Sequence, residues 1–297
     1  MIPAATTRFK HFESVHRCTV CGIGQLVSLF SPDVSRCGEC GVILRQTRPT
    51  QEDVREYHEL ALSTLRHRTG EEQERDAERH RKNLKRVQQV MGPPQEAGRV
   101  LLDIGTGRGE FLELAQQASW LVLGTELSPV VAAKAQEQRG IEVLAGQLTE
   151  IPFGGRTFDA ITMWDVLDYL PNPGEALRFL HRLLRPRGVL FLSVTNADET
   201  MLKHKLKPTE SNPLGDLEPG DDARLTHFQA KTLRQALTRN GYEIKDFSGE
   251  GKSGGGAWWA GPLKGALKLS SGMDLSPTLH AVVVTDRAPV KRAENYE

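Results

Sequence analysis

The sequence predicts an α/β fold, in which a mostly parallel sheet covered by helices on both faces follows a small cysteine-rich domain. From Arg99 onward, short apolar segments alternate with amphipathic ones, which is the pattern of strands and helices in a parallel sheet. All four cysteines precede this alternation. A chain of 297 residues is long enough for one large domain and one small one.

The elements of the main domain follow from apolar periodicity and from helix caps. Strands are predicted over residues 100–104, 120–125, 141–145, 158–163, 189–194, 242–247 and 279–285. Helices are predicted over residues 110–118, 129–139, 174–184 and 231–239. Ser128 precedes the second helix as its N-cap, and Asn240-Gly241 ends the last one. These elements together predict a Rossmann-like, seven-stranded sheet with helices on both faces.

Changes in composition divide the chain into three segments. Residues 1–50 contain the cysteines and short apolar runs near Val27 and Val42, which predict hairpin strands. Residues 51–92 are highly charged, with a thin apolar stripe that is typical of a connecting helix. Gly92-Pro93-Pro94 breaks the chain, so residues 93–297 are predicted to form the main domain.

The cysteines form two Cys-x-x-Cys pairs, Cys18/Cys21 and Cys37/Cys40, and a glycine directly follows each pair. Two such turns can converge on one ion and close a shell of four thiolates, which describes a structural zinc site. The N-terminal residues lack an apolar leader, so a disulfide framework is the weaker interpretation and a cytoplasmic location is expected. Four thiolates do not by themselves distinguish zinc from iron. A domain this small depends on its metal for stability.

A glycine-rich turn follows the first strand of the main domain. The turn has the pattern Asp-x-Gly-x-Gly-x-Gly, formed by Asp103, Gly105, Gly107 and Gly109. Glu110 stands where a dinucleotide-binding turn needs its last glycine, so the pattern does not indicate a dinucleotide site. Glu126 closes the second strand, where a carboxylate can accept hydrogen bonds from both hydroxyls of a ribose.

These motifs resemble those of the class I S-adenosylmethionine-dependent methyltransferases, and more closely a bacterial subgroup with an N-terminal zinc ribbon. Residues 40–53 read CGVILRQTRPTQED, similar to the subgroup's second Cys-x-x-Cys-Gly, apolar stretch, RPT turn and acidic helix. The resemblance extends to FDAI at residues 158–161, DVLDYL at 165–170, LRPRGVL at 184–190 and His227-Phe228. It covers nearly the whole chain and implies an enzyme that uses S-adenosylmethionine.

The resemblance also implies a set of cofactor-binding residues. It places Asp103, Gly105, Thr106, Gly107 and Gly109 at the methionine part, Glu126 and Leu127 at the ribose, Gln147 and Leu148 at the adenine, and Trp164 and Asp165 at the sulfonium. Gln147 departs from the family, which usually has an aspartate there. Its amide oxygen can still accept a hydrogen bond from the adenine amino group, as a neutral acceptor.

Several methyl acceptors are excluded by the sequence. Every cysteine is assigned to the ribbon, so no cysteine nucleophile is left to methylate a pyrimidine carbon. The tetrapeptide Met163-Trp164-Asp165-Val166 is not the Asn/Asp-Pro-Pro-aromatic sequence of many amino-group methyltransferases that act on bases or glutamine. O-, N- or C-methylation of a small molecule remains, and the resemblance suggests a sugar or glycan precursor as acceptor.

Three residues are candidates for the catalytic step. His227 lies in a loop before a helix and has a side chain suited to a general base, although a structural or helix-capping role is the alternative. Asp168 and Tyr169 stand where the family often has an acid followed by histidine. The tyrosine at the second position weakens the case for a base in that pair.

Two other function classes remain open at this point. In one, the ribbon recognises RNA or a protein that the enzyme methylates; in the other, the chain is a non-catalytic cofactor-binding subunit. The net charge of zero argues against a nucleic-acid partner. The intact glycine turn and Glu126 argue against a non-catalytic role.

One apolar segment near the C-terminus has no assigned role in this scheme. Residues 257–270 contain Trp258, Trp259, Leu263 and Leu267, which predict a lid or packing segment, with weak contact to a membrane surface as the alternative. No apolar run is long enough to cross a bilayer. No feature of the sequence specifies an oligomeric state.

Overall fold

The computed structural model describes residues 9–63, 69–94, 98–198, 200–202, 223–250 and 276–285. The predicted lid, packing or surface segment at residues 257–270 lies outside these residues. Within them, no helix combines the length and the apolar character needed to cross a membrane.

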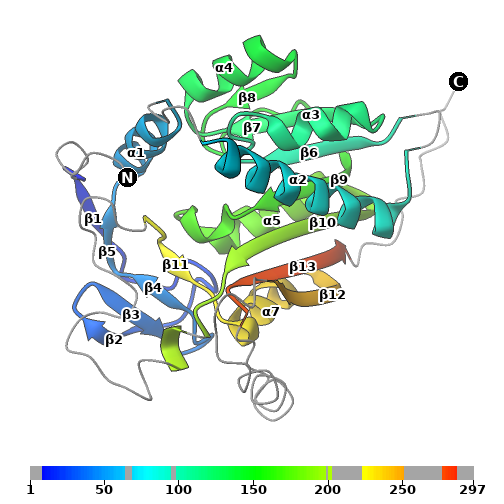
Figure 1. Cartoon of the computed structure of the whole chain (residues 1–297). Helices are drawn as coiled ribbons and strands as arrows, with labels where there is room; N and C mark the ends of the chain where they lie inside the picture. Colours follow the sequence, from blue (N-terminus) through cyan, green and yellow to red (C-terminus); the bar gives the residue numbers. More distant parts are fainter. Residues whose placement is uncertain are drawn as a thin grey trace, which may run out of the picture.

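A seven-stranded sheet forms the centre of the molecule (Figure 1). Its strands, in spatial order, are β12 (Tyr242–Glu250), β13 (Thr278–Thr285), β10 (Leu184–Thr195), β9 (Phe158–Trp164), β6 (Val100–Ile104), β7 (Leu121–Glu126) and β8 (Val143–Ala145). Neighbours from β10 to β8 are parallel, whereas β13 pairs antiparallel with β10 and β12. The predicted Rossmann-like, mostly parallel sheet is therefore confirmed, and the carboxyl ends of its five parallel strands meet at one edge.

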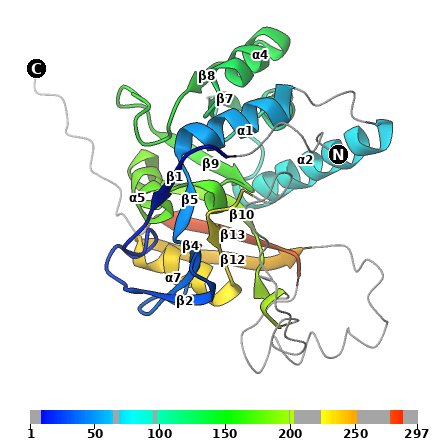
Figure 2. The same ribbon diagram turned by 90° about the vertical axis from the view of Figure 1, so that its left-hand side faces the viewer.

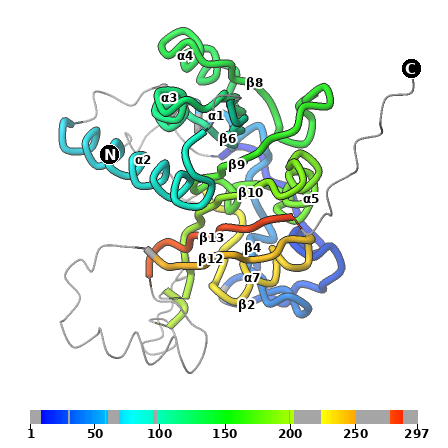
Figure 3. The backbone as a smooth tube through the Cα atoms, turned by 90° about the vertical axis from the view of Figure 1, so that its right-hand side faces the viewer, coloured from blue at the N-terminus to red at the C-terminus, as the bar shows by residue number. Residues whose placement is uncertain are grey.

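Helices cover both faces of the sheet, as Figure 3 shows for α2 and α3 on one side and α7 on the other. They are α1 (Gln51–Ser63), α2 (Gly70–Met91), α3 (Glu110–Gln117), α4 (Pro129–Arg139), α5 (Pro173–Leu183) and α7 (Ala230–Arg239). Alternate strand residues enter opposite cores, because side chains alternate along a strand. Leu101 and Phe191 pack with α2, α3 and α4, whereas Leu102 and Leu192 pack with α5 and α7.

The N-terminal region forms two small sheets beside α5 and α7 (Figure 2). Its strands are β1 (Phe12–Ser14), β2 (Leu26–Ser31), β3 (Val34–Cys37), β4 (Ile43–Arg45) and β5 (Thr47–Pro49). Strand β1 pairs with β5, and β2, β3 and β4 form an antiparallel meander. A fourth strand, β11 (Thr226–His227), pairs with β4 of the meander although it lies much later in the chain. We refer to residues 12–49 as the ribbon.

The predicted elements of the main domain are all present, and most differ from the structure only at their ends. Strand β10 differs more, because it begins at Leu184 instead of residue 189, and its register with β9 shifts between these positions. Arg187 has a positive φ of 65° within this irregular stretch, which is uncommon for a residue with a side chain. The connecting segment consists of two helices, and Thr69 and Glu72 form a capping box at the start of α2. The domain boundaries at residues 50 and 92 stay predictions.

Candidate cofactor and metal sites

The four cysteines lie together at one end of the ribbon. Their sulfur atoms all lie within 4.8 Å of one another, with 3.6 Å between Cys18 and Cys40 and 3.6 Å between Cys21 and Cys37. The glycine that follows each pair has a left-handed backbone, with φ of 79° at Gly22 and 72° at Gly41. Glycine adopts this conformation without a steric penalty, so the backbone after each cysteine pair can turn tightly around the sulfurs. This donor set fits a tetrahedral, closed ion site.

The ribbon is packed into the main core and does not stand apart from it. Cys18, Val20 and Val42 belong to the same buried cluster as residues of β9, β10, α5 and α7. The amide of Gly174 at the start of α5 donates to the carbonyl of Thr19 at 3.2 Å. A Cβ atom on Gly174 would lie only 2.1 Å from the Val20 carbonyl oxygen, so this contact requires glycine.

Two arginines of the ribbon extend these contacts toward the sheet edge. The side chain of Arg45 is 1% exposed and donates through Nε to the Arg224 carbonyl at 3.1 Å. Arg48 donates to the Pro171 carbonyl at 2.6 Å and pairs with Glu13 at 2.7 Å. Buried arginines require such acceptors, and both carbonyls belong to segments next to the parallel sheet.

The glycine turn leaves the sheet at the end of β6. Gly105 has a φ of 68°, and a Cβ atom there would lie 2.6 Å from a methyl group of Val166. Gly107 also has a positive φ, and the space beside it is open, so a ligand can approach its backbone. Gly109, with a φ of 76°, is the N-cap of α3. The tight turn predicted from the sequence is present.

Asp103 supports this turn from beneath. Its carboxylate accepts a hydrogen bond from Thr162 Oγ1 at 2.6 Å, and its side chain is buried. Burial raises the pKa of Asp103 to about 7, although hydrogen bonds from Thr162 and Thr106 oppose this shift. Asp103, Thr106 and Gly109 do not line the cavity described below, so the structure gives them a supporting position.

Glu126 stands at the end of β7 and faces the turn. One carboxylate oxygen accepts from the Gly107 amide at 3.0 Å and the other from the Ser128 amide at 3.1 Å. Burial raises the pKa of Glu126, while these amide donors favour its ionised form. Ser128 caps α4 through Val131, as predicted, and also donates to Glu59 of α1 at 3.0 Å. This last bond holds α1 near the sheet edge.

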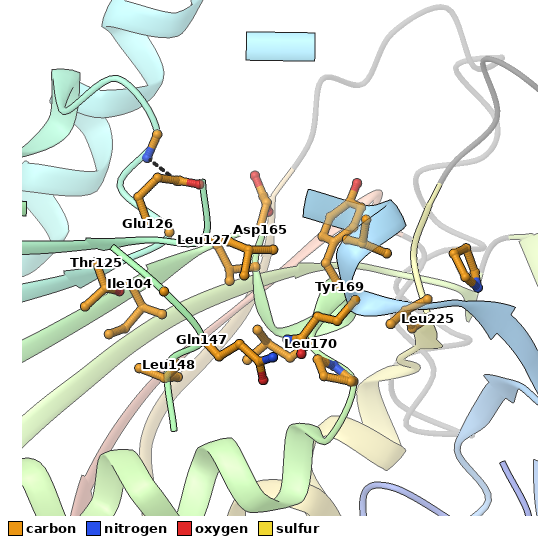
Figure 4. A pocket seen from close by; sticks show the side chains of 18 of the residues that line it. Ile104, Thr125, Glu126, Leu127, Gln147, Leu148, Asp165, Tyr169, Leu170 and Leu225 are labelled. Atoms are coloured by element: carbon orange, nitrogen blue, oxygen red, sulfur yellow. Dashed lines mark hydrogen bonds between the residues drawn. The ribbon is translucent and has the colours of Figure 1, made fainter. Parts of the chain in front are cut away.

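A cavity of about 330 Å³ opens at the carboxyl edge of the sheet (Figure 4). Among the predicted cofactor residues, those that line it are Gly105, Gly107, Glu126, Leu127, Gln147, Leu148, Trp164 and Asp165. They come from the ends of β6, β7, β8 and β9. Figure 4 shows Glu126 and Gln147 across the cavity from Tyr169 and Leu225. The structure therefore brings most of the predicted cofactor residues to one volume.

Other residues of this cavity were not anticipated from the sequence. Glu13 of β1, Pro49 of β5, and Gln51 and Val54 of α1 form part of its wall. Leu225, just before β11, also lines it. The sequence assigned the first four to the ribbon and the connecting helix. A local pattern does not show which of these segments packs against the edge of the sheet. The ribbon and α1 thus contribute directly to the cavity.

Asp165 follows β9 and has an unusual backbone conformation. Its φ is 57°, which is uncommon for a residue with a side chain. Its amide donates to the Ser193 hydroxyl at 3.0 Å, and that hydroxyl donates back to the Asp165 carboxylate at 2.7 Å. The neighbouring Trp164 ring packs edge-on against Phe111 at 5.7 Å. These contacts hold both side chains at the end of β9, where they line the cavity.

Asp168 and Tyr169 belong to a short 3-10 helix, η1 (Leu167–Tyr169), after β9. Tyr169 lines the cavity, whereas Asp168 is fully buried behind it. The Asp168 carboxylate accepts from the Thr195 amide at 3.2 Å and lies 4.0 Å from the Arg224 guanidinium. Burial raises the pKa of Asp168 to about 7 despite that guanidinium. Of this pair, only Tyr169 can contact a bound molecule in the cavity.

The structure places His227, the candidate general base, in a buried strand away from the cavity. His227 lies in β11, pairs with Ile43 of the ribbon, and is only 6% exposed. Burial, and then the nearby charges of Arg45 and Arg224, lower its pKa to about 3. It does not line the cavity, and its Nε2 atom has no hydrogen-bond partner among the described residues. A neutral imidazole sealed beneath the ribbon suits the structural alternative better than proton transfer near neutral pH.

Comparison with known proteins places this geometry in a family. Residues 74–246 match the family model described as a methyltransferase domain, which is more than half of the chain. The chain belongs to this methyltransferase family. It has the class I fold that the sequence resembles, and its match begins within α2 and ends within β12.

Related sequences and structures agree with that assignment. The chain is 29% identical over 151 residues to the ubiquinone biosynthesis O-methyltransferase of Pseudomonas paraeruginosa and 30% identical to that of Pseudomonas aeruginosa. Each match covers 48% of this chain and 64% of the relative, so the chain spans less than two thirds of either relative.

Solved structures share the fold of this methyltransferase domain. Magnesium protoporphyrin IX methyltransferase from Synechocystis PCC 6803, with bound S-adenosylhomocysteine, has a TM-score of 0.53 at 15% identity, covering 78% of this chain and 98% of its own. A chain of the complex that contains the Haloferax volcanii Trm112 methyltransferase activator has a TM-score of 0.51 at 18% identity, covering 71% and 92%. The ribbon and α1 of this chain precede the residues that match the methyltransferase family, although they line the same cavity.

Proposed function

We propose that this protein transfers a methyl group from S-adenosylmethionine to a small-molecule acceptor. One observation carries the proposal: the glycine turn, Glu126, Gln147 and Asp165 surround a single cavity at the carboxyl edge of the parallel sheet. Ligands of open α/β sheets bind at this edge. The cavity lies within a methyltransferase domain and contains residues from four consecutive parallel strands.

Each part of the cofactor has a fitting partner in the cavity. Glu126 would accept hydrogen bonds from the ribose hydroxyls, which replace or join the amide donors it already has. The open backbone at Gly107 would meet the methionine part, and Gln147 with Leu148 would hold the adenine between an amide and an apolar wall. When bound, S-adenosylmethionine supplies an electrophilic methyl group on its sulfonium.

The remaining residues would position that methyl group and exclude water from it. Asp165, held by Ser193, places a carboxylate at the end of β9, where it would face the positive sulfonium. Tyr169 would close the opposite side of the cavity, and Asp168 would hold η1 through the Thr195 amide. Gln51 and Val54 of α1 would close the cavity above the cofactor. Transfer between two positioned molecules requires little further chemistry from the protein.

The ribbon is proposed to hold one structural zinc ion through Cys18, Cys21, Cys37 and Cys40. Four sulfurs within 4.8 Å of one another support this site. Zinc with four thiolates has no open position for a substrate or water, so the ion would act on folding alone. As domains, we propose a zinc-ribbon domain at residues 1–50, a connecting segment at residues 51–92 and a methyltransferase domain at residues 93–297. Strand β11 joins the first of these domains to the last.

A small acceptor is favoured over RNA or protein because the ribbon packs against the main domain, which leaves less of its surface available to a macromolecule. Its cysteine cluster is buried in the common core, and its β4 edge is covered by β11. The relatives named above act in ubiquinone biosynthesis, by their names, which also concerns small molecules. Among small molecules, a sugar or glycan precursor remains our proposal from the resemblance of the sequence.

Cofactor binding tests the first part of the proposal. Calorimetry should show that S-adenosylhomocysteine binds the wild-type chain, and that Glu126→Ala weakens binding by roughly 1–3 kcal/mol, the range for lost hydrogen bonds to a charged group. Glu137→Ala on the exposed face of α4 is the matched control and should bind like the wild type. Gln147→Asp should also retain binding, because a carboxylate can accept from the same amino group. Equal affinity of wild type and Glu126→Ala would contradict the ribose role.

The acceptor class needs a separate test. A bacterial extract is divided by ultrafiltration into a small-molecule fraction and a macromolecular fraction, and each is incubated with the protein and S-adenosylmethionine. Release of S-adenosylhomocysteine with the small-molecule fraction alone supports the proposal. Release with the macromolecular fraction alone, abolished by nuclease or protease, would overturn it in favour of RNA or protein.

A further inference from the structure

A second and larger cavity lies next to the cofactor cavity. Its volume is about 870 Å³, and Asp165 lines both cavities. One wall is α2, and the other is formed where β10 and β13 pair, by Ser193, Thr278 and His280. The size is within the range of pockets that hold small molecules. None of the roles proposed above uses this cavity.

The helix wall of this cavity carries a row of cations. Arg75, Arg79 and Lys82 line it, and their spacing of four and three residues places them on one face of α2. Arg86, four residues further on, continues this face and reaches the His280 ring at 3.4 Å. We call Arg75, Arg79 and Lys82 the basic row.

Glu71, Glu74 and Glu78 of α2 also line this cavity, and the last two pair with a cation outside it. Glu74 and Glu78 each contact Arg81, at 2.5 Å and 3.2 Å, and Arg81 is not part of the cavity wall. Arg79 pairs with Asp76 at 3.2 Å, but its side chain is 56% exposed, so a ligand can still reach the guanidinium. The far wall supplies hydroxyl groups from Ser193 and Thr278 in place of further carboxylates, apart from Asp165.

The basic row and the cofactor site meet at Asp165. Arg79 NH1 lies 3.9 Å from the Asp165 carboxylate, and Ser193 bonds the same carboxylate from the far wall. The Trp164 ring of the first cavity lies 6.3 Å from the His280 ring of the second. A molecule in the second cavity would therefore have one end beside Asp165, where the methyl group is to be transferred, and the other along α2.

We infer that the second cavity binds the methyl acceptor, and that the basic row holds an anionic group of that acceptor, a phosphate or a carboxylate. The inference rests on the proposed function, because it takes Asp165 as the point where acceptor and cofactor meet. Arginine binds both kinds of oxyanion through paired N–H donors, and lysine adds a mobile point charge. Binding at a distance from the reacting atom would orient the acceptor toward the methyl group.

The inference is tested by the binding of small anions to protein saturated with S-adenosylhomocysteine. Calorimetry at constant ionic strength compares pyrophosphate and citrate, which separate a phosphate site from a carboxylate site, with glucose as an uncharged probe. We expect pyrophosphate or citrate to bind and glucose not to bind. Lys82→Gln and Arg79→Gln should each weaken anion binding about tenfold or more, the effect of losing one charge-assisted hydrogen bond.

A matched variant separates a defined site from general surface charge. Lys85→Gln removes the same charge three residues past the end of the basic row, from an exposed residue that does not line the cavity, and should leave anion binding unchanged. Equal losses in Lys82→Gln and Lys85→Gln would overturn the inference, as would the absence of anion binding. A short single-stranded RNA that binds more tightly than either anion, and depends on Lys82, would overturn it in favour of a macromolecular acceptor.

These outcomes can be told apart from a failure of the proposed function. If S-adenosylhomocysteine binds but neither anion does, only the anionic acceptor is refuted. If S-adenosylhomocysteine does not bind, the cofactor site itself is refuted, whatever the anions do.

Discussion

The ribbon is organised around four cysteine side chains, whereas the carboxyl edge of the sheet is organised by backbone turns and buried carboxylates. In the ribbon, the four sulfurs lie within 4.8 Å of one another among short strands, an arrangement that an ion would stabilise. At the sheet edge, Glu126 accepts from backbone amides and Asp103 accepts from Thr162, so the edge is held by its own hydrogen bonds. We therefore expect the ribbon, unlike the sheet edge, to depend on a bound ion for its folding.

The two regions are nevertheless joined through one short segment. The Arg45 amide donates to the Leu225 carbonyl at 2.9 Å, and the Leu225 amide donates to the Asp168 carbonyl at 2.9 Å. Leu225 itself lines the cofactor cavity, directly before the β11 strand that pairs with the ribbon. We therefore expect an ion bound in the ribbon to order one wall of the cofactor cavity through this segment.

Loss of the metal site should have the largest effect. Cys37→Ser removes one of four ligands, and the ribbon should unfold because its folding free energy comes largely from the ion. Since Cys37 lies in the common core, the main domain should also lose stability and bind S-adenosylhomocysteine more weakly. Zinc content, thermal unfolding and calorimetry measure these effects. Arg36→Gln, at an exposed position of β3, is the control, and a Cys37→Ser protein with wild-type affinity would show that the regions are independent.

The packing between ribbon and α5 can be tested without touching the metal. Gly174→Ala would place a Cβ atom 2.1 Å from the Val20 carbonyl oxygen, and backbone cannot move aside cheaply. We expect a loss of about 3 kcal/mol in the free energy of unfolding, the upper part of the range for overpacking. Gly70→Ala, at an open position in the first turn of α2, should be neutral or slightly stabilising. Similar stabilities of the two variants would mean that the ribbon does not pack on α5 as described.

The buried carboxylate behind the cavity predicts a specific dependence on pH. The pKa of Asp168 is about 7 in the folded state, above its ordinary value near 3.8. Between these values the carboxyl group is protonated in the folded protein and ionised in the unfolded chain. The stability that is present below pH 4 is therefore lost as pH rises through 7.

Asp168→Asn removes this titration but retains an acceptor for the Thr195 amide. Denaturant unfolding at pH 4.5 and pH 7.5 gives the free energy of unfolding of both proteins. The variant's advantage over the wild type should be about 1–2 kcal/mol larger at pH 7.5 than at pH 4.5. Asp33→Asn, at an exposed position, should follow the wild-type curve at both pH values. If the free energy of unfolding depended on pH in the same way in the variant and the wild type, Asp168 would not have a raised pKa in the folded protein.

His227 should give the smallest effect, on stability and not on catalysis. Its pKa is lowered to about 3, so the wild type loses stability as pH falls below about 6.5, because the unfolded chain binds the proton first. His227→Gln should remove this slope and cost about 1 kcal/mol through altered packing and hydrogen bonding. Once an acceptor is identified, turnover of folded enzyme and its pH profile should stay unchanged. A loss of roughly 10²–10⁴ in turnover at normal stability would restore the general-base role.

The sheet edge could be predicted from the sequence far better than the ribbon's position. Gly105, Gly107 and Glu126 stand in a continuous strand–turn–helix pattern, so local rules place them together. The spacing of the cysteines likewise predicted their convergence. In contrast, no local pattern shows that Arg45 is buried against residue 224, since this contact joins positions far apart in the chain.

His227 shows why the chemistry of a residue type is a weak guide on its own. Its place before α7 suggested a loop at the catalytic edge, but a two-residue strand pairs it with the ribbon and removes it from solvent. The basic row was also present in the sequence as part of a charged helix. It became a candidate site only when the structure placed β10 and β13 opposite α2.

A crystal structure of the protein with S-adenosylhomocysteine would test the central claim most directly. We expect the ribose hydroxyls on the Glu126 carboxylate, the adenine between Gln147 and Leu148, and the sulfur beside Asp165, with α1 and the ribbon closing the cavity. A ligand bound elsewhere, or bound at this edge without contact to Glu126, would contradict it.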